Sequence, residues 1–413
     1  MKVRGFVWVC IACGLLLSLA CAPTHTQQTG QPQPAAPTQE TPATEEQGSD
    51  VSFSPQKLAV SDAQVRRLTL PAGFQVGVFA RGVADARVIA VGADGTVYVS
   101  QPELGQITAL WDRRGTGQAE TRRVVVSGIP GVHGLAVRAN KLYLAAPTRV
   151  YVADINADGS VGKPRAFINN LPAGGRHPHR TMAFGPDGLL YVSVGSDCND
   201  CAEKNPELAT ILQMHADGSG RRVFARGLRN TMAFAWHPAS REMWGVDQGS
   251  DNRGPNTPPE ELNHIIDGGD YGWPWCYGDR QVDALTPGHP DNTNKAQFCP
   301  TTQPMVLGYQ AHSSPIQLVF YTGTQFPAAY RKDAFITFHG SWNRRPAVGY
   351  KVVRIRFDAA GRPTGFEDFL TGFLTDNGSA QFGRPAGLAL TRDGALLIGD
   401  DSNGVIYRVT YKG

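Results

Sequence analysis

One pattern recurs along most of this chain: an apolar strand, a turn that contains Asp-Gly or an equivalent, and a second apolar strand. Apolar alternation on both sides of a Gly-containing turn is the signature of a β-hairpin. The copies occupy residues 88–100, 134–146, 182–196, 233–248, 318–340 and 387–411. The earlier copies are roughly 45 to 50 residues apart, a period typical of propeller blades. The pattern therefore predicts an all-β, six-bladed β-propeller, with each blade packed on its neighbours around a central channel.

The rest of the folded region fits this architecture. Residues 73–80, GFQVGVFA, form an additional strand ahead of the first copy, and we expect it to complete the last blade. The chain has 47 Gly and 29 Pro, which favours many turns over long helices, and only residues 207–215 carry a helical signal. An insertion at about residues 251–312 lengthens the later intervals. A β-sandwich is the alternative fold, but it explains the repeat period poorly.

The N-terminus carries a signal for export. Residues 1–4, MKVR, are basic, and residues 6–19 are apolar over a length too short to span a bilayer comfortably. The following LSLAC resembles the lipobox of bacterial lipoproteins. We therefore expect residues 1–20 to be a lipoprotein signal peptide and Cys21 to be lipidated, so that acyl chains alone anchor the mature protein. An ordinary signal peptide cleaved nearby and a weak anchor helix are the alternatives.

A low-complexity segment follows the signal. Residues 22–50 are rich in Pro, Gln and Thr and hold almost no large apolar side chains, so they cannot form a core. We expect residues 21–64 to be a disordered tether that holds a propeller domain, residues 65–413, away from the membrane. A net charge of +3 without a basic run gives no indication of nucleic-acid binding. The predicted location is the cell envelope, on the periplasmic or outer surface.

The seven cysteines sort by position. Cys10 and Cys13 leave with the signal peptide and Cys21 takes lipid, which leaves Cys198, Cys201, Cys276 and Cys299. An even number in an exported protein favours disulfides, most simply Cys198–Cys201 and Cys276–Cys299. A metal site at the CNDC stretch lacks a second clustered pair, and haem attachment would require a His where Ala202 stands.

Charged and imidazole side chains stand just before several predicted strands. They are His177, His179 and Arg180 in the third copy, Arg229 and Asn230 in the fourth, and Arg384 in the sixth. Because propellers usually place function on the loops at one mouth of the channel, we expect these side chains to meet there. Guanidinium groups pair bidentately with carboxylates, and a neutral histidine can accept a proton. The set predicts a site for a polyanionic ligand and a substrate that loses a proton.

Longer motifs carry a resemblance to a known family. They are HPHRTMAFGPDGLLYVSVGS, ARGLRNTMAFAWHP, WGVDQGSDN, EELNHIIDGGDYGWPWCYG, FHGSWNRRPAVGYKVVRIRF and GRPAGLALTRDGALLIGDDSNGVIYRVTY. In them the sequence resembles the glucose/sorbosone dehydrogenase family, six-bladed propeller enzymes that use pyrroloquinoline quinone (PQQ), and is most similar to its sorbosone-type branch. The resemblance implies a PQQ- and Ca²⁺-dependent enzyme that oxidises a sugar hydroxyl or sugar aldehyde and passes electrons to an external acceptor.

The resemblance also implies roles for single residues. The family's catalytic base lies eight positions before the Gly of a Gly-Pro-Asp turn; that turn is residues 185–187 here, so the implied base is His177. It would take the hydroxyl proton while hydride passes to the quinone, with His179 as the alternative base. Arg229 and Asn230 match a pair that binds the cofactor.

Further matches concern the metal and the remaining cofactor contacts. Gln248, Gly249 and Ser250 match a segment where two successive backbone carbonyls hold Ca²⁺, a hard cation that prefers oxygen ligands and that would polarise the quinone. This assigns Gly249 and Ser250 to the metal and Gln248 to the cofactor. Arg384 matches the first of two arginines that the glucose-oxidising branch uses against PQQ, and Arg344 is expected to take the place of a Lys of that branch.

Three positions depart from the glucose-oxidising branch. Arg176 stands where an Asp precedes the base, Ser196 replaces an Asp after the next strand, and Ala386 replaces the second C-terminal arginine. These differences leave PQQ as the expected cofactor and make glucose itself a less favoured substrate. His312 and His339 are further candidates for the pocket. The alternative functions are a lactone hydrolase on a six-bladed propeller and a non-catalytic binding propeller, because fold alone does not decide function.

Overall fold

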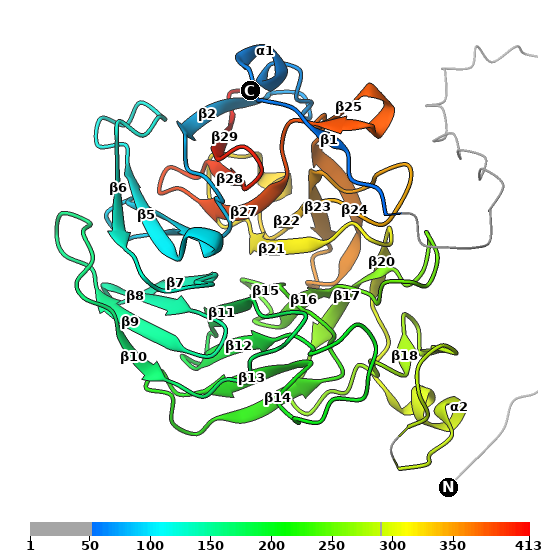
Figure 1. Cartoon of the computed structure of the whole chain (residues 1–413). Coiled ribbons are helices and arrows are strands. Elements are labelled where there is room, and N and C mark those ends of the chain that lie inside the picture. Colours follow the sequence, from blue (N-terminus) through cyan, green and yellow to red (C-terminus); the bar gives the residue numbers. More distant parts are fainter. Residues whose placement is uncertain (1–51, 290) are drawn as a thin grey trace, which may run out of the picture. The chain divides into compact units, whose positions relative to one another are not determined.

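The computed structural model describes residues 52–289 and 291–413, so the predicted signal peptide, Cys21 and most of the predicted tether lie outside the described residues. Within them the chain is almost entirely β-structure, in six four-stranded sheets and two smaller ones (Figure 1). This confirms the predicted all-β class. No helix of this part of the chain is long and apolar enough to cross a membrane.

Five of the six sheets take their strands in chain order. The first contains β3 (Ile89–Val91), β4 (Val97–Gln101), β5 (Gln106–Trp111) and β6 (Thr121–Val126), and the second β7 (Gly134–Arg138), β8 (Lys141–Ala145), β9 (Val150–Asp154) and β10 (Arg165–Ile168). The third contains β11 (Arg180–Phe184), β12 (Leu190–Val194), β13 (Thr210–Met214) and β14 (Arg222–Arg226). The fourth contains β15 (Ala233–Trp236), β16 (Met243–Asp247), β17 (Glu260–Ile265) and β20 (Leu307–Tyr309), and the fifth β21 (Pro315–Phe320), β22 (Ala334–Phe338), β23 (Lys351–Phe357) and β24 (Pro363–Leu370).

The sixth sheet joins the two ends of the folded region. Its strands are β27 (Pro385–Leu390), β28 (Leu396–Asp400), β29 (Val405–Tyr411) and β2 (Phe74–Arg81). β2 pairs antiparallel with β29, from Phe74 opposite Tyr411 to Arg81 opposite Val405. This pairing confirms the prediction that residues 73–80 complete the last of the repeated units.

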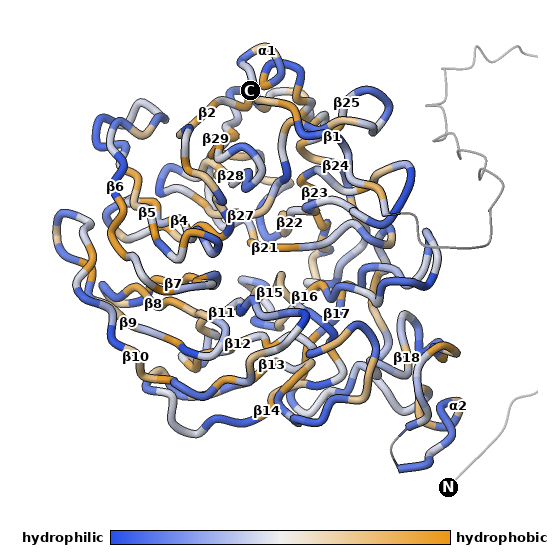
Figure 2. Tube along the Cα trace, viewed as in Figure 1, coloured by the Kyte–Doolittle hydropathy of each residue, from blue (hydrophilic) through white to orange (hydrophobic). Residues whose placement is uncertain are grey.

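Apolar clusters between neighbouring sheets hold them together. The first strands touch one another, since β3 lies against β7 and β27, β7 against β11, and β21 against β15 and β27 (Figure 1). The large clusters combine side chains of adjacent sheets, such as Tyr98 of the first with Leu144 of the second and Tyr191 of the third with Phe234 of the fourth. Figure 2 shows the apolar stretches on the strands and the polar ones on the connecting loops.

Two local predictions are wrong. Residues 207–215 do not form a helix, because β13 runs through them with Ile211 and Leu212 both fully buried in two different clusters. A strand buried on both faces reads as a continuous apolar run, which periodicity cannot separate from a buried helix. The folded region also begins before residue 65: β1 (Gln56–Lys57) pairs with β26 (Ala380–Gln381), and Ser61 caps α1 (Asp62–Val65).

The predicted insertion contributes to the fold in two ways. β17 and β20 lie within residues 251–312 yet supply two of the four strands of the fourth sheet. The remainder carries β18 (Cys276–Tyr277), β19 (Gln281–Val282) and α2 (Lys295–Phe298), closed by the Cys276–Cys299 disulfide. Cys198 pairs with Cys201, so both expected disulfides are confirmed. The short elements that complete the described chain are β25 (Leu374–Thr375), η1 (Pro102–Leu104), η2 (Cys299–Thr301), η3 (Ala328–Tyr330) and η4 (Asp376–Gly378).

The packing of Phe74 predicts how strongly β2 stabilises the fold. Its ring lies 4.8 to 5.0 Å from the rings of Phe326, Tyr330, Phe369 and Tyr411. We expect Phe74→Ala to lower the free energy of unfolding by about 3–5 kcal/mol, because it leaves a cavity among these rings. Denaturant unfolding measures the change, and Val124→Ala, at a 47% exposed position, is the control expected to stay within about 0.5 kcal/mol. Equal unfolding midpoints for the two variants would contradict the assigned packing.

Candidate functional site

Residues directly ahead of the first strands gather at one place. They are Arg87 before β3, His133 before β7, His179 before β11, Asn230 before β15 and Arg384 before β27. The His133 and His179 rings stack with their centroids 4.7 Å apart, the charges of Arg87 and Asp401 act on His179, and the charge of Arg384 acts on Asp401. Side chains of the first, second, third and sixth sheets therefore share one mouth, as their in-register positions predicted.

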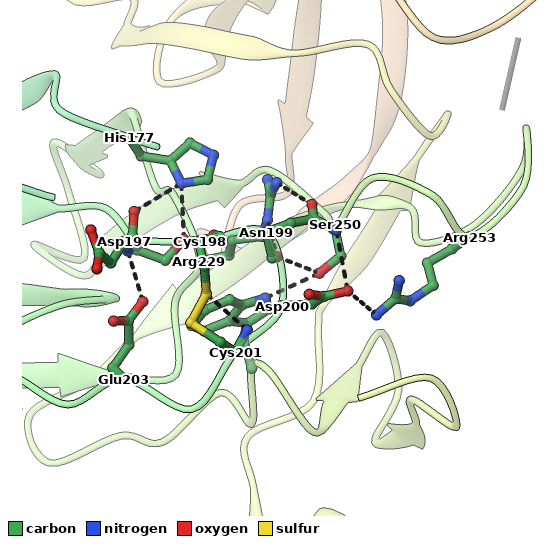
Figure 3. The surroundings of a disulfide bond; sticks show 12 residues. His177, Asp197, Cys198, Asn199, Asp200, Cys201, Glu203, Arg229, Ser250 and Arg253 are labelled. Atoms are coloured by element: carbon green, nitrogen blue, oxygen red, sulfur yellow. Dashed lines mark hydrogen bonds and ion pairs between the residues drawn. A yellow bond between two sulfur atoms is a disulfide. The ribbon is translucent and has the colours of Figure 1, made fainter. Parts of the chain in front are cut away.

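His177 lies at this mouth with one ring nitrogen fixed. Its Nδ1 is 3.1 Å from the carbonyl oxygen of Ser196 and 2.9 Å from the Ser196 hydroxyl (Figure 3). Because a carbonyl oxygen only accepts, Nδ1 carries the proton and the lone pair resides on Nε2. Nε2 has no hydrogen-bond partner among the described residues, so this lone pair is available to a ligand in the mouth.

The electrostatics of the mouth keep His177 neutral. Burial, and after it the positive charge of Arg229, lower the pKa of His177 to about 3. Burial and the charge of Arg87 likewise lower the pKa of His179 to about 4. A proton on either imidazole would sit beside guanidinium groups with little water to solvate it. Both imidazoles are therefore unprotonated, and able to accept a proton, at neutral pH.

Arg180 serves the structure of the loop around His177. Its side chain is fully buried and donates to the carbonyl oxygens of Pro147, Pro172, His177 and His179 at 2.6 to 3.1 Å. A buried guanidinium is tolerated only when its N–H groups find such acceptors. Arg180 therefore fixes the backbone that presents His177 and His179, and its charge does not point at a ligand as the sequence analysis expected for this strand entrance.

Gly195 allows His177 and Asn230 to lie close together. A Cβ placed on Gly195 would lie 2.6 Å from the His177 Cβ and 2.7 Å from Asn230 Oδ1. Only glycine fits there, because real Cβ atoms do not approach other atoms so closely. The strand pair β11–β12 thus brings the predicted base against the predicted cofactor-binding amide.

Asp247 organises the Arg229–Asn230 turn. Its carboxylate accepts hydrogen bonds from the backbone N–H groups of Arg229 and Asn230, both at 2.9 Å, and from the Thr231 hydroxyl. The Arg229 guanidinium is buried and donates to Asn199 and to Asp251 Oδ2 at 3.1 Å. Burial raises the pKa of Asp247 to about 6, since its partners are mostly neutral N–H groups.

The segment predicted to bind a cation has two successive carbonyl oxygens without hydrogen-bond donors. Neither the Gly249 nor the Ser250 carbonyl oxygen accepts a hydrogen bond from any residue that the structure describes. Around them, the Gly249 N–H donates to Glu260 at 3.4 Å and the Ser250 hydroxyl accepts from the Trp273 indole at 3.1 Å. Two successive carbonyls without donors suit a hard cation. Gln248 instead supports Asn230, whose Nδ2 donates to Gln248 Oε1 at 2.9 Å.

Arg384 belongs to a second charged group at the mouth. Its guanidinium donates to the carbonyl oxygens of His339 and Gly340 at 3.3 and 3.0 Å. The His339 imidazole lies 2.8 Å from Asp401, and Arg87 pairs with the same carboxylate at 2.5 Å. Burial acts to raise the pKa of Asp401, but the His339 imidazole and the Arg87 guanidinium that face it outweigh burial and lower the pKa.

Arg87 and Asp401 belong to the candidate site but were not predicted from the sequence. Arg87 stands just ahead of β3, much as Arg384 stands ahead of β27, so the repeat itself carried the signal. Asp401 follows β28 directly and has no motif of its own. Two further expected members have partners within the protein. Arg344 donates to the Pro255 carbonyl at 2.6 Å. His312 contacts Gly254 and Asn343, and Asn343 donates to Asp251, the partner of Arg229, at 2.9 Å.

The site fits a planar, polyanionic ligand. Arg87, Arg229 and Arg384 are cations from three different sheets, and Arg87 Nε is buried without a partner among the described residues. Carboxylates are the anions that guanidinium groups recognise best, through paired N–H donors. With a neutral imidazole and two donor-free carbonyls beside them, these groups match a cofactor with several carboxylates, a divalent cation and a proton-releasing substrate.

Comparisons with known sequences point to one family. A family model described as TrAA12-like matches residues 68–412. An uncharacterized protein of Borreliella burgdorferi is 30% identical over 360 residues, which cover 84% of this chain and 91% of that protein. A pyrroloquinoline quinone-dependent pyranose dehydrogenase of Coprinopsis cinerea is 30% identical over 114 residues, which cover 23% of this chain and 15% of the longer enzyme.

Solved structures share the fold at low sequence identity. The holo PQQ domain of the Coprinopsis cinerea pyranose dehydrogenase has a TM-score of 0.70 at 22% identity, covering 83% of this chain and 97% of that one. A calcium structure of a Trichoderma reesei family AA12 enzyme has a TM-score of 0.71 at 22% identity, covering 88% and 99%. The soluble aldose sugar dehydrogenase of Escherichia coli, in its apo-form, has a TM-score of 0.62 at 16% identity, covering 82% and 99%.

The environment of His177 predicts its titration. We expect its imidazole to remain neutral, with the proton on Nδ1, down to about pH 4, because burial and Arg229 disfavour the charged form. Two-dimensional NMR of the ring nitrogens measures both the tautomer and the pKa, and His177→Gln identifies the signal. A pKa near the ordinary histidine value of about 6.5, or a proton on Nε2, would contradict the described environment.

Proposed function

The chain belongs to the TrAA12-like family, which fits the PQQ sugar dehydrogenases that its motifs resemble, and we propose that it is a PQQ-dependent oxidoreductase. Its substrate is a sugar carrying a reactive hydroxyl or aldehyde, and its electrons leave to an external acceptor. The observation that carries the proposal is the neutral His177 imidazole with an unengaged Nε2, which lies close to Arg229 and two residues from His179, on which the charge of Arg87 acts.

The six sheets are, in this proposal, the blades of one closed propeller. Support comes from the pairing of β2 with β29 and from the contacts of β27 with both β3 and β21. The channel mouth then collects the strand entrances of all blades, so that groups far apart in sequence act on one ligand.

Three guanidinium groups and one amide would hold the cofactor. PQQ carries three carboxylates and supplies, when bound, a two-electron acceptor beside the substrate. Arg229, Arg384 and Arg87 provide positive charge that does not titrate near neutral pH, and Asn230 provides a polar contact whose orientation Gln248 fixes. Arg344, whose Nη1 donates to the Pro255 carbonyl, would be a further cofactor contact.

Gly249 and Ser250 would hold Ca²⁺ through their carbonyl oxygens. Both oxygens lack donors in the described residues, and calcium prefers neutral and anionic oxygen ligands. Glu260 beneath them has a pKa raised to about 8 by burial. At neutral pH this carboxyl is therefore mainly protonated, so the carbonyls are the stronger ligands on this side.

His177 would act as the general base. Oxidation of a substrate hydroxyl carbon loses one hydride and one hydroxyl proton: PQQ would supply the acceptor for the hydride, and His177 Nε2 would accept the proton. Ser196 holds Nδ1–H and so keeps the lone pair on Nε2 directed at the mouth. His179 is the less suitable base, because its ring stacks on His133.

Replacement of His177 separates this proposal from its rivals. For the mature chain loaded with PQQ and Ca²⁺, we expect His177→Gln to lower dye reduction with responsive aldoses about 10²- to 10⁴-fold, the usual contribution of a general base. PQQ affinity from absorbance titration should change little, and exposed His215→Gln is the control. No PQQ binding by the wild-type protein would refute the proposal; lactone hydrolysis without dye, abolished by chelation, would indicate a hydrolase instead.

The export signal completes the proposal. Residues 1–20 would be removed and lipidated Cys21 would anchor the enzyme in the cell envelope, with residues after Cys21 as a tether that lets the mouth meet soluble sugars and the electron acceptor.

Substitution of Cys21 tests the anchor. In a bacterial host we expect Cys21→Ser to abolish the lipid-dependent increase in mass and to move the protein from the detergent phase to the aqueous phase. The matched control is Cys10→Ser, which should leave both unchanged because Cys10 lies within the removed peptide. A wild-type mature chain that starts elsewhere or carries no acyl chain would overturn the anchor.

A further inference from the structure

The loop closed by Cys198 and Cys201 contacts Arg229, Ser250 and the Ser196 hydroxyl that holds His177 (Figure 3). The Cys198 carbonyl accepts the Ser196 hydroxyl at 2.7 Å, and Ser196 in turn holds His177 Nδ1. Asp197 accepts the Arg176 N–H at 2.9 Å and lies so close that a Cβ on Gly175 would be 1.9 Å from its carboxylate. The backbone around His177 therefore packs directly on this loop.

Asn199, inside the disulfide loop, anchors the Arg229 guanidinium. Its carbonyl accepts from Arg229 Nε at 2.9 Å, and its side-chain oxygen accepts from Arg229 Nη2 at 2.8 Å. The same carbonyl accepts the Ser250 hydroxyl at 3.2 Å, and the side chain exchanges hydrogen bonds with the Asp251 backbone at 2.9 and 3.0 Å. One residue thus links the third sheet's loop to Arg229 and to the carbonyl segment.

The two disulfides differ in access and in what they constrain. Cys198 and Cys201 are partly exposed, whereas Cys276 and Cys299 are buried at 3% and 0% exposure. A cross-link between residues three apart removes much less chain entropy from the unfolded state than one between residues 23 apart. The short disulfide therefore contributes mainly to the local conformation of the loop, and a reductant reaches it first.

We propose that the Cys198–Cys201 disulfide is a reducible positioning element, which keeps Asn199 and Ser196 in place and so orients Arg229, Ser250 and His177. The proposal rests on the proposed function for its consequence on cofactor binding. An external dithiol, or two molecules of a monothiol, supplies two electrons and two protons, is oxidised to a disulfide, and leaves two cysteine thiols in the protein. The opened loop no longer fixes Asn199, and the mouth loses affinity for a polyanion while the fold persists.

Mild reduction of the native mature protein tests this directly. Dithiothreitol without denaturant should expose two thiols, mapped to Cys198 and Cys201 by alkylation and mass spectrometry. PQQ dissociation constants from absorbance titration should rise about 10- to 100-fold, the usual effect of losing partners behind ligand-holding groups, and reoxidation should restore them. The double variant Cys198→Ser/Cys201→Ser should bind PQQ weakly, and the reductant should not change its affinity. Its thermal unfolding midpoint should stay close to that of the wild type.

Two further measurements keep this inference separate from the proposed function. NMR of the His177 ring nitrogens needs no cofactor. Reduction should raise the His177 pKa, because a loosened loop admits water.

The second measurement uses a variant. Asn199→Ala should weaken PQQ binding with the disulfide intact, whereas the control Asn170→Ala, beside Arg221, should not. Unchanged PQQ affinity and unchanged His177 pKa after confirmed reduction would overturn the inference. A wild-type protein that binds no PQQ would refute the function, and the His177 pKa alone would then decide for or against the positioning role.

Discussion

Buried guanidinium groups held by backbone carbonyls are the interaction on which this site depends. Removing an arginine from water costs several kcal/mol unless its N–H groups find acceptors inside the protein. Arg180 finds four carbonyls, Arg229 finds Asn199 and Asp251, and Arg384 finds His339 and Gly340. Arg180 and Arg384 donate to neutral carbonyls, so their positive charge is kept in place without a direct ion pair, whereas Arg229 is also paired with Asp251. The mouth is therefore preorganised to attract anions.

The same arrangement separates the behaviour of neighbouring acids. Asp400 accepts backbone N–H groups of Arg384, Ser402 and Asn403, and burial raises its pKa to about 7. Asp401 next to it faces the His339 imidazole and the Arg87 guanidinium, which outweigh burial and lower its pKa. Two adjacent carboxyls thus differ in charge near neutral pH because of their partners alone. The ionised one balances part of the charge of Arg87, and the other adds little repulsion toward an anionic ligand.

The features that could be predicted from the sequence are those that depend on residues close together in the chain. Repeats, the β2–β29 pairing and both disulfides were predictable, since hairpin turns, apolar alternation and cysteine spacing are local signals. The helix expected at residues 207–215 failed because burial on both faces hides the strand period. The Arg87–Asp401 pair was not predicted, because it joins residues 314 apart in sequence and no local sequence pattern indicates a contact between sheets. The register of strand entrances was the one nonlocal signal available, and His179 and Arg384 do belong to one group of charges, connected through Arg87 and Asp401.

A pKa of about 3 for His177 appears at first too low for a base that must work near neutral pH, and the charges of the mouth resolve this. The low value arises from burial and from the positive charge of Arg229, which acts on His177 even though Asp251 pairs with that arginine. At an effective dielectric constant of about 20, one negative charge about 5 Å away is worth about 3 kcal/mol, or about two pKa units. A ligand with several carboxylates would therefore raise the His177 pKa toward the working range. By linkage, ligand binding and proton uptake at His177 then favour each other to the same extent. The cations that lower the pKa of His177 are therefore also the groups that would bind the anionic ligand, and that ligand would raise the pKa of His177 again.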